Sequence, residues 1–192
     1  MDAPADYASA ARYLTSHLPA YVSYVVHTHV TSGFGDKDES ERITVRTSDG
    51  VVVKGNADIN FHIDADHGSS VPHIHDQPFN PACFTATGAN PGTFDGRAVE
   101  VLDINDTCSN RSSDTSFSKF YVDARSHEPL AVVADKSEQP VEVRVEQRFT
   151  RVRESVLPSS LDVAIKGSGF MFWLNVAVRR DYSDYTFSDR AP

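Results

Sequence analysis

Apolar positions near the start of the chain recur with the period of a helix. In ADYASAARYLTSHL, residues 5–18, Tyr7 and Leu14 fall on one face together with the alanines between them. Asp6 is a candidate helix cap, and Pro19 is expected to end the helix. The pattern predicts one amphipathic helix at the N-terminus.

Most of the remaining sequence alternates with the period of two that is typical of half-buried strands. Clear examples are AYVSYVVHTHV at 20–30, RAVEVLDI at 97–104 and PVEVRVEQRFTRV at 140–152. Ser-Asp-Gly at 48–50 predicts one hairpin, and residues 126–129 predict a second one. The pattern favours about nine or ten antiparallel strands, and a mainly β, α+β fold.

Two stretches interrupt this alternation. The polar segment TSGFGDKDESE, residues 31–41, is expected to be a loop. Residues 59–96 contain four prolines and are expected to form a long irregular insertion. Neither stretch resembles a linker between domains, so we expect residues 1–192 to form a single domain.

The strand near the C-terminus suggests a ligand site. Residues 170–178 are apolar at both parities, which is typical of a strand covered on both faces. A curved sheet with an apolar concave face would form a pocket for an apolar ligand, whereas a closed sandwich core would leave no cavity. For the first case, the residues predicted to line the cavity are Leu14, Phe149, Met171 and Trp173.

Charge and hydropathy narrow the possible partners. The net charge is -9 and no run of Lys and Arg exceeds two residues, which argues against nucleic acid and polybasic membrane binding. The longest apolar run, residues 169–178, is too short to span a bilayer as a helix. The opening MDAPADYASA resembles a mature N-terminus with an added initiator Met, so we expect that a signal segment has been removed.

Two cysteines, Cys83 and Cys108, are the complete set in the chain, and both lie in sequence rich in loop-forming residues. Two such cysteines predict a disulfide formed in an oxidising compartment. Two free thiols are the alternative.

The stretch NFHIDADHGSSVPHIHDQPFNP, residues 60–81, is rich in histidine and raises the question of a metal site. His73 and His75 would place two imidazoles on one face of an extended segment, and Asp76 is a possible third ligand. A cupin-like site also needs a nearby Glu, which is missing, and a distant His in a matching context, which His127 does not supply. We therefore expect no metal or cofactor, and keep a metal-dependent β-barrel enzyme as the alternative.

Two further polar patterns are interpreted as solvated sheet faces. His27 and His29 share one face of the first predicted strand, and the alternative is that they line a cleft. Glu and Arg alternate through residues 142–148, where opposite charges would pair across an outer face for little net energy.

The order of these signals resembles the outer-membrane lipoprotein-sorting, periplasmic lipoprotein carrier-like proteins of bacteria and their uncharacterised relatives. The resemblance rests on FYVDARSHEPL, which matches an aromatic–x–Asp–x–x–(Ser/Thr)–x–x–Pro hairpin frequent in that group, and on the closing DYSDYTFS. It covers residues 5–58 and 97–188.

The resemblance implies a leading helix packed on a highly curved antiparallel sheet, an unclosed half-barrel. It also implies periplasmic residence and a hydrophobic cavity for a lipid or acyl chain, with no catalytic residues. The resulting hypothesis is an exported, non-enzymatic bacterial protein that binds a lipid-like or other apolar ligand. The alternatives are the metal-dependent enzyme centred on His73 and His75, and a structural or partner-binding envelope protein without a ligand.

Overall fold

The computed structural model describes residues 2–33, 35–55, 79–108, 116–138, 141–169 and 172–192. The elements, in chain order, are α1 (Ala3–Thr15), β1 (Tyr21–Ser32), β2 (Gly35–Arg46), β3 (Val51–Lys54), the 3-10 turn η1 (Pro81–Cys83), β4 (Phe84–Phe94), β5 (Arg97–Asp106), β6 (Lys119–Asp123), β7 (Pro129–Glu138), β8 (Val141–Val152), β9 (Ser155–Gly169) and β10 (Phe172–Ser188).

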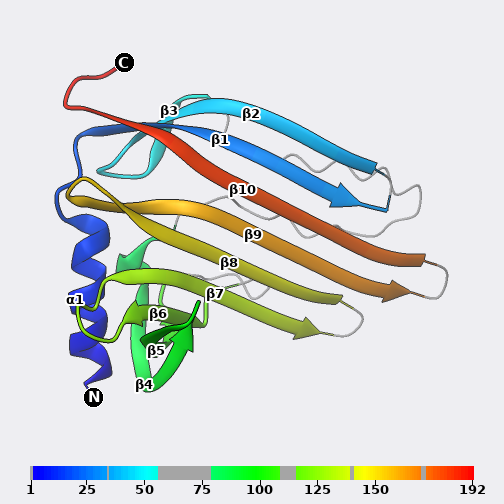
Figure 1. Cartoon of the computed structure of the whole chain (residues 1–192), viewed down its shortest axis with the longest axis horizontal. Helices are drawn as coiled ribbons and strands as arrows, with labels where there is room; N and C mark the ends of the chain where they lie inside the picture. The colour runs from blue at the N-terminus through cyan, green and yellow to red at the C-terminus, as the bar shows by residue number, and fades with distance from the viewer. Residues whose placement is uncertain (1, 34, 56–78, 109–115, 139–140, 170–171) are drawn as a thin grey trace.

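The strands form one antiparallel sheet in the order β3-β2-β1-β10-β9-β8-β7-β6-β5-β4. The sheet does not close, because β3 and β4 lie at opposite edges. The pairs β1–β10, β4–β5, β6–β7 and β8–β9 each contain a register shift, and such bulges bend a sheet. Figure 1 shows β7 to β10, β1 and β2 as long arms, with β4 to β6 turned across one end beside α1. The predicted fold class, an N-terminal helix on an unclosed antiparallel sheet, is confirmed.

Helix α1 starts earlier than the sequence pattern predicts. Asp2, rather than Asp6, caps the helix by accepting a hydrogen bond from the backbone N–H of Ala5 at 3.4 Å. The prediction for the cap was therefore wrong, and Asp6 lies within the first turn. The helix ends at Thr15, where the extended backbone of Ser16 leads toward Pro19.

Two segments expected to be irregular contain strands. Residues 35–41 lie in β2, where they pair with β1 although their side chains are exposed. Residues 84–94 form β4 inside the stretch 59–96 that was expected to be irregular, so the prediction was wrong for this part. Pro91 is accommodated because β4 is an edge strand, where one N–H side needs no partner. Residues 56–78 of that stretch lie outside the described residues.

The two predicted hairpins are confirmed. Strands β2 and β3 pair across the turn that contains Gly50, whose φ of +70° suits glycine. Strands β6 and β7 pair across residues 124–128. There Asp123 accepts hydrogen bonds from the N–H groups of Arg125 and Ser126, both at 2.9 Å, which fixes the turn.

Candidate functional site

The apolar side of the sheet consists of two groups of buried side chains. The first, here called the helix-side cluster, comprises Ala3, Tyr7, Ala10, Phe79, Ala86, Leu102, Ile104, Phe120, Val122, Val132, Phe149 and Val156. The second, here called the distal cluster, comprises Ala134, Val143, Val145, Leu161, Val163, Ile165, Val176 and Val178.

Strand register places both clusters on the same sheet face. Val132 of the helix-side cluster and Ala134 of the distal cluster are two residues apart on β7, so their side chains point the same way. Val132 pairs with Phe120, against which the ring of Tyr7 from α1 packs. We call this side, on which α1 lies, the inner face. The partly buried ring of Phe117 packs against both clusters, so the apolar surface is continuous.

Helix α1 covers the helix-side cluster through a few specific contacts. The rings of Tyr7 and Phe120 meet edge to face, with centroids 5.7 Å apart. The Tyr7 hydroxyl donates to the carbonyl oxygen of Pro81 at 2.7 Å, and burial raises the pKa of Tyr7. At the other end of the helix, the Ser155 hydroxyl donates to the carbonyl oxygen of His17 at 2.7 Å. These contacts hold α1 against η1 on one side and β9 on the other.

Aromatic rings fill the space beneath the helix. Phe79 lies at their centre, and its backbone N–H donates to the side-chain oxygen of Gln147 at 3.1 Å. Its ring packs against four others, with centroid distances of 4.9 to 6.3 Å: Phe84, Phe117, Phe120 and Phe149. The helix-side cluster is therefore a densely packed aromatic core.

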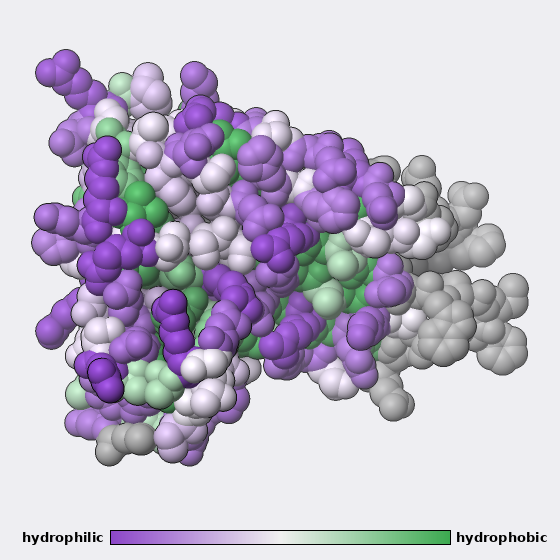
Figure 2. Space-filling model, viewed as in Figure 1, coloured by the Kyte–Doolittle hydropathy of each residue, from purple (hydrophilic) through white to green (hydrophobic). Residues whose placement is uncertain are grey.

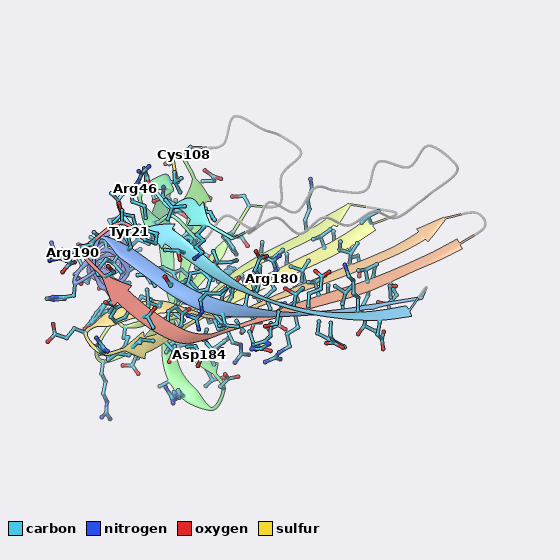
Figure 3. The ribbon with its side chains drawn as sticks, turned by 90° about the horizontal axis from the view of Figure 1, so that it is seen from above. Tyr21, Arg46, Cys108, Arg180, Asp184 and Arg190 are labelled. Atoms are coloured by element: carbon cyan, nitrogen blue, oxygen red, sulfur yellow. A yellow bond between two sulfur atoms is a disulfide. The ribbon has the colours of Figure 1, made fainter. Side chains whose placement is uncertain are left out.

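The distal cluster differs in composition and cover. All of its members are aliphatic, they come from β7 to β10, and none comes from α1. Where the two clusters meet, one cross-strand row on the inner face contains two polar residues, Arg180 and Gln147, beside Leu161 of the distal cluster and Val132 of the helix-side cluster. Arg180 and Gln147 are only 4% and 3% exposed. Figure 3 shows Arg180 part-way along the long arms, away from the end where Tyr21 and Arg46 lie.

The four residues predicted to line a cavity have different outcomes. Phe149 is buried in the helix-side cluster, and Leu14 packs against that cluster from α1. Met171 lies outside the described residues, and Trp173 is described only as a backbone position paired with Ser168. The distal valines were not predicted as a group, although the alternation in VEVRVEQ and LDVAI contained the signal.

The opposite face of the sheet is charged. Figure 2 shows one side of the molecule as mainly hydrophilic, with a small apolar area over the long strands. Arg144 pairs with Asp135 at 3.0 Å and with Glu146 at 3.2 Å, as expected for the alternating charges of β8. Because charge pairs of this kind are close to solvent, they contribute little to stability.

A cavity of about 370 Å³ lies on this outer face and is lined by residues of β1 and β8 to β10, including Arg179, Asp162 and His29. The ring nitrogen Nδ1 of His29 lies 2.7 Å from a carboxylate oxygen of Asp38, and this hydrogen bond raises the pKa of the imidazole. The expectation of a solvated sheet face therefore holds: His27 and His29 are both exposed, and only His29 is among the residues that line this cavity.

The cysteines are joined as predicted: a disulfide links Cys83 of η1 to Cys108, which follows β5. The backbone N–H of Thr107 also donates to the carbonyl oxygen of Cys83 at 2.7 Å. The other metal-ligand candidates, His73, His75 and Asp76, lie outside the described residues.

Comparison with solved structures identifies the architecture. A LolA superfamily protein from Nitrosomonas europaea superposes with a TM-score of 0.51 at 12% identity, covering 100% of this chain and 96% of that one. A domain assigned to outer membrane lipoprotein-sorting proteins, from Vibrio parahaemolyticus, superposes with a TM-score of 0.57 at 8% identity, covering 97% and 93%. The chain has the LolA-type fold.

The LolA-type fold confirms the resemblance to lipoprotein-sorting proteins that the sequence predicts, at the level of architecture. No family model matches the sequence, and no curated protein matches it either. In the described part of the chain, no helix is long and apolar enough to cross a membrane.

Proposed function

We propose that the chain is a non-catalytic binding protein that takes a lipid-like, apolar ligand on the inner face of its sheet. One observation carries this proposal: the apolar inner face continues through the distal cluster, beyond the part that α1 covers. A protein of similar fold is assigned to lipoprotein sorting, which is the same class of ligand chemistry.

The distal cluster has the chemistry that an extended acyl chain would contact. Val145, Val163 and Val178 lie in one cross-strand row over β8, β9 and β10, and Val143, Ile165 and Val176 form the next row. Parallel rows of branched aliphatic side chains give a smooth apolar strip without hydrogen-bonding groups. Each methylene of an acyl chain that this strip removes from water contributes about 0.8 kcal/mol.

The helix-side cluster limits how far such a ligand can reach. Its aromatic rings are closely packed under α1, and Phe120 and Leu102 are fully buried. A ligand on the distal strip therefore approaches the row containing Arg180 and Gln147 and stops there, unless α1 moves.

The disulfide also indicates the cellular compartment in which the protein would bind its ligand. Disulfides form and persist in oxidising compartments such as the bacterial periplasm. Cys83 and Cys108 are joined, so we extend the proposal to an exported protein that encounters its ligand in the periplasm.

The test is a titration with a fatty acid that carries an environment-sensitive fluorophore. The wild-type chain should bind it saturably. A double variant, Val176→Thr and Val178→Thr, keeps the side-chain shapes but adds two hydroxyls to the inner face. Each hydroxyl that the ligand leaves without a partner costs about 1–3 kcal/mol, so affinity should fall by about tenfold or more.

The matched control is Ala177→Ser on the same strand, because Ala177 is exposed between the two buried valines. This variant should bind as the wild type does. The thermal midpoint and the circular dichroism spectrum of each variant show whether the sheet is intact. The proposal fails if the wild type does not bind the probe, or if folded inner-face and outer-face variants bind it equally well.

A further inference from the structure

Three titratable side chains from separate elements meet near the start of α1. They are Asp6 of α1, Glu100 of β5 and His127 of the turn between β6 and β7. The Nδ1 atom of His127 lies 3.7 Å from Oε2 of Glu100 and 3.9 Å from Oδ1 of Asp6. One ligand atom from each residue falls within 4.8 Å of the other two.

Burial makes this arrangement costly for the protein alone. The Glu100 side chain is only 8% exposed, and its Oε1 atom is buried without a hydrogen-bond partner. The buried Nδ1 atom of His127 also has no hydrogen-bond partner. Buried polar atoms are normally satisfied, and leaving one without a partner costs a large part of its hydration energy. Two such atoms on neighbouring side chains of one cluster indicate that a further group belongs among these side chains.

The space at these atoms is open to a small ligand. A cavity of about 270 Å³ is lined by all three residues, together with Asp2, Val99, Pro91 and Ala124. Two carboxylates and an imidazole supply negative charge and one nitrogen donor, which suits a cation and repels an anion. The candidate ligand is therefore a small cation rather than a phosphate or a carboxylate.

The distances select the kind of cation. In a tetrahedral site with bonds of about 2.0–2.1 Å, neighbouring ligand atoms are about 3.4 Å apart. The separations of His127 Nδ1 from the Glu100 and Asp6 oxygens, 3.7 and 3.9 Å, need to contract by only a few tenths of an ångström. One imidazole with two carboxylates and an open fourth position is a ligand set for Zn²⁺ or a related divalent transition metal. Calcium and magnesium prefer six or more oxygen ligands.

We infer that Asp6, Glu100 and His127 form a binding site for a Zn²⁺-class divalent ion, with water as the fourth ligand. The ion would join α1, β5 and the β6–β7 turn, which are far apart in the sequence. Its binding would fix the first turn of α1 to the sheet, at the opposite end of the helix from His17. The inference does not depend on whether the inner face binds a lipid.

The test uses Co²⁺, whose visible absorption reports tetrahedral coordination, added to the tag-free, metal-stripped chain. We expect one tetrahedral Co²⁺ per chain, displaced by Zn²⁺, and a higher thermal midpoint when either ion is bound. Glu100→Gln retains the shape of the side chain and removes its charge. Loss of an outer-shell partner already costs about 10- to 100-fold in affinity, so loss of a direct ligand should cost at least that much.

A second variant pair controls for the histidine-rich stretch. His127→Asn should lose the tetrahedral spectrum while circular dichroism shows the same sheet as the wild type. His73→Ala combined with His75→Ala should keep the spectrum. The inference is overturned if the wild type gives no tetrahedral spectrum. It is also overturned if the spectrum survives in folded Glu100→Gln and His127→Asn, or if it disappears only with the His73 and His75 substitutions.

Discussion

The two apolar clusters lie on one sheet face but differ in their side chains and in their contact with α1. Beneath α1, the packing is aromatic and is closed by the helix, the disulfide and the hydroxyl of Tyr7. Along the arms, the packing is aliphatic and includes no residue of the helix. Both clusters are buried, but only the aromatic one is packed against the helix, and the proposed function assigns the ligand to the aliphatic one.

The largest expected effect on the free energy of unfolding comes from removing a buried aromatic ring, compared with a partly exposed one. Phe120→Ala removes a fully buried ring from the helix-side cluster and should lower the free energy of unfolding by about 3–5 kcal/mol. Phe94→Ala makes the same chemical change at a partly exposed ring on β4 and should cost clearly less. Urea unfolding followed by circular dichroism measures both. Equal losses would contradict the assignment of the helix-side cluster as the main core.

Removing the disulfide should have the next largest effect on stability. Cys83 and Cys108 are 25 residues apart, and closing a loop of that length restricts the unfolded chain by about 3 kcal/mol. The double variant Cys83→Ser and Cys108→Ser should therefore unfold at a lower temperature, and reductant should no longer change its midpoint. A wild-type midpoint that is unaffected by reductant under unfolding conditions would show that the bridge contributes nothing.

The hydroxyl of Tyr7 provides a finer probe of how α1 is held. Tyr7→Phe removes its bond to the Pro81 carbonyl, a part-buried contact, and should cost about 1 kcal/mol. Tyr13→Phe removes an exposed bond to the Ser126 carbonyl and should cost less. Hydrogen exchange of α1 amides should rise more in the first variant. The same increase in both would mean that burial of the contact does not matter.

The smallest expected effect depends on pH. Hydrogen bonds from the N–H groups of Ser126 and Arg125 lower the pKa of Asp123. The carboxylate therefore stabilises the fold above its unfolded pKa of about 3.9, and this contribution is lost as the pH falls through the lower folded value. Asp123→Asn should be less stable than the wild type at neutral pH, and the difference should shrink in acid. A difference that is constant with pH would rule out the charge as its cause.

The sequence predicts the parts of the fold that depend on local pattern. The N-terminal helix, the two hairpins and the long alternating strands follow from spacing and turn residues, which act over a few positions. The disulfide also follows, because loop context and cysteine scarcity are both visible in the sequence.

Strands β2 and β4 show where local pattern is insufficient. Residues 35–41 of β2 have no apolar face, and they form a strand only because β1 supplies a partner backbone. The charged side chains suit this position, since β3 pairs with residues 44–46 alone and leaves this part of β2 as an edge among the described strands. In β4, Gly88 and Pro91 are typical of loops, and the edge position tolerates them.

The candidate sites depend on residues distant in the sequence. Asp6, Glu100 and His127 come together only because α1 crosses the end of the sheet beside β5. In the sequence, Asp6 is typical of a helix cap and Glu100 of an exposed strand position. The distal cluster needs the register of β7 to β10 before its valines form one strip.

The most direct test of the proposed function is photo-crosslinking with a fatty acid that carries a diazirine at the end of its acyl chain. Residue-level mass spectrometry then locates the label. The account predicts saturable labelling of the inner-face residues Val143, Ile165 and Val176, suppressed by unlabelled fatty acid. Labelling of Ala164 and Ala177 on the outer face instead, or labelling that unlabelled fatty acid does not suppress, would contradict it.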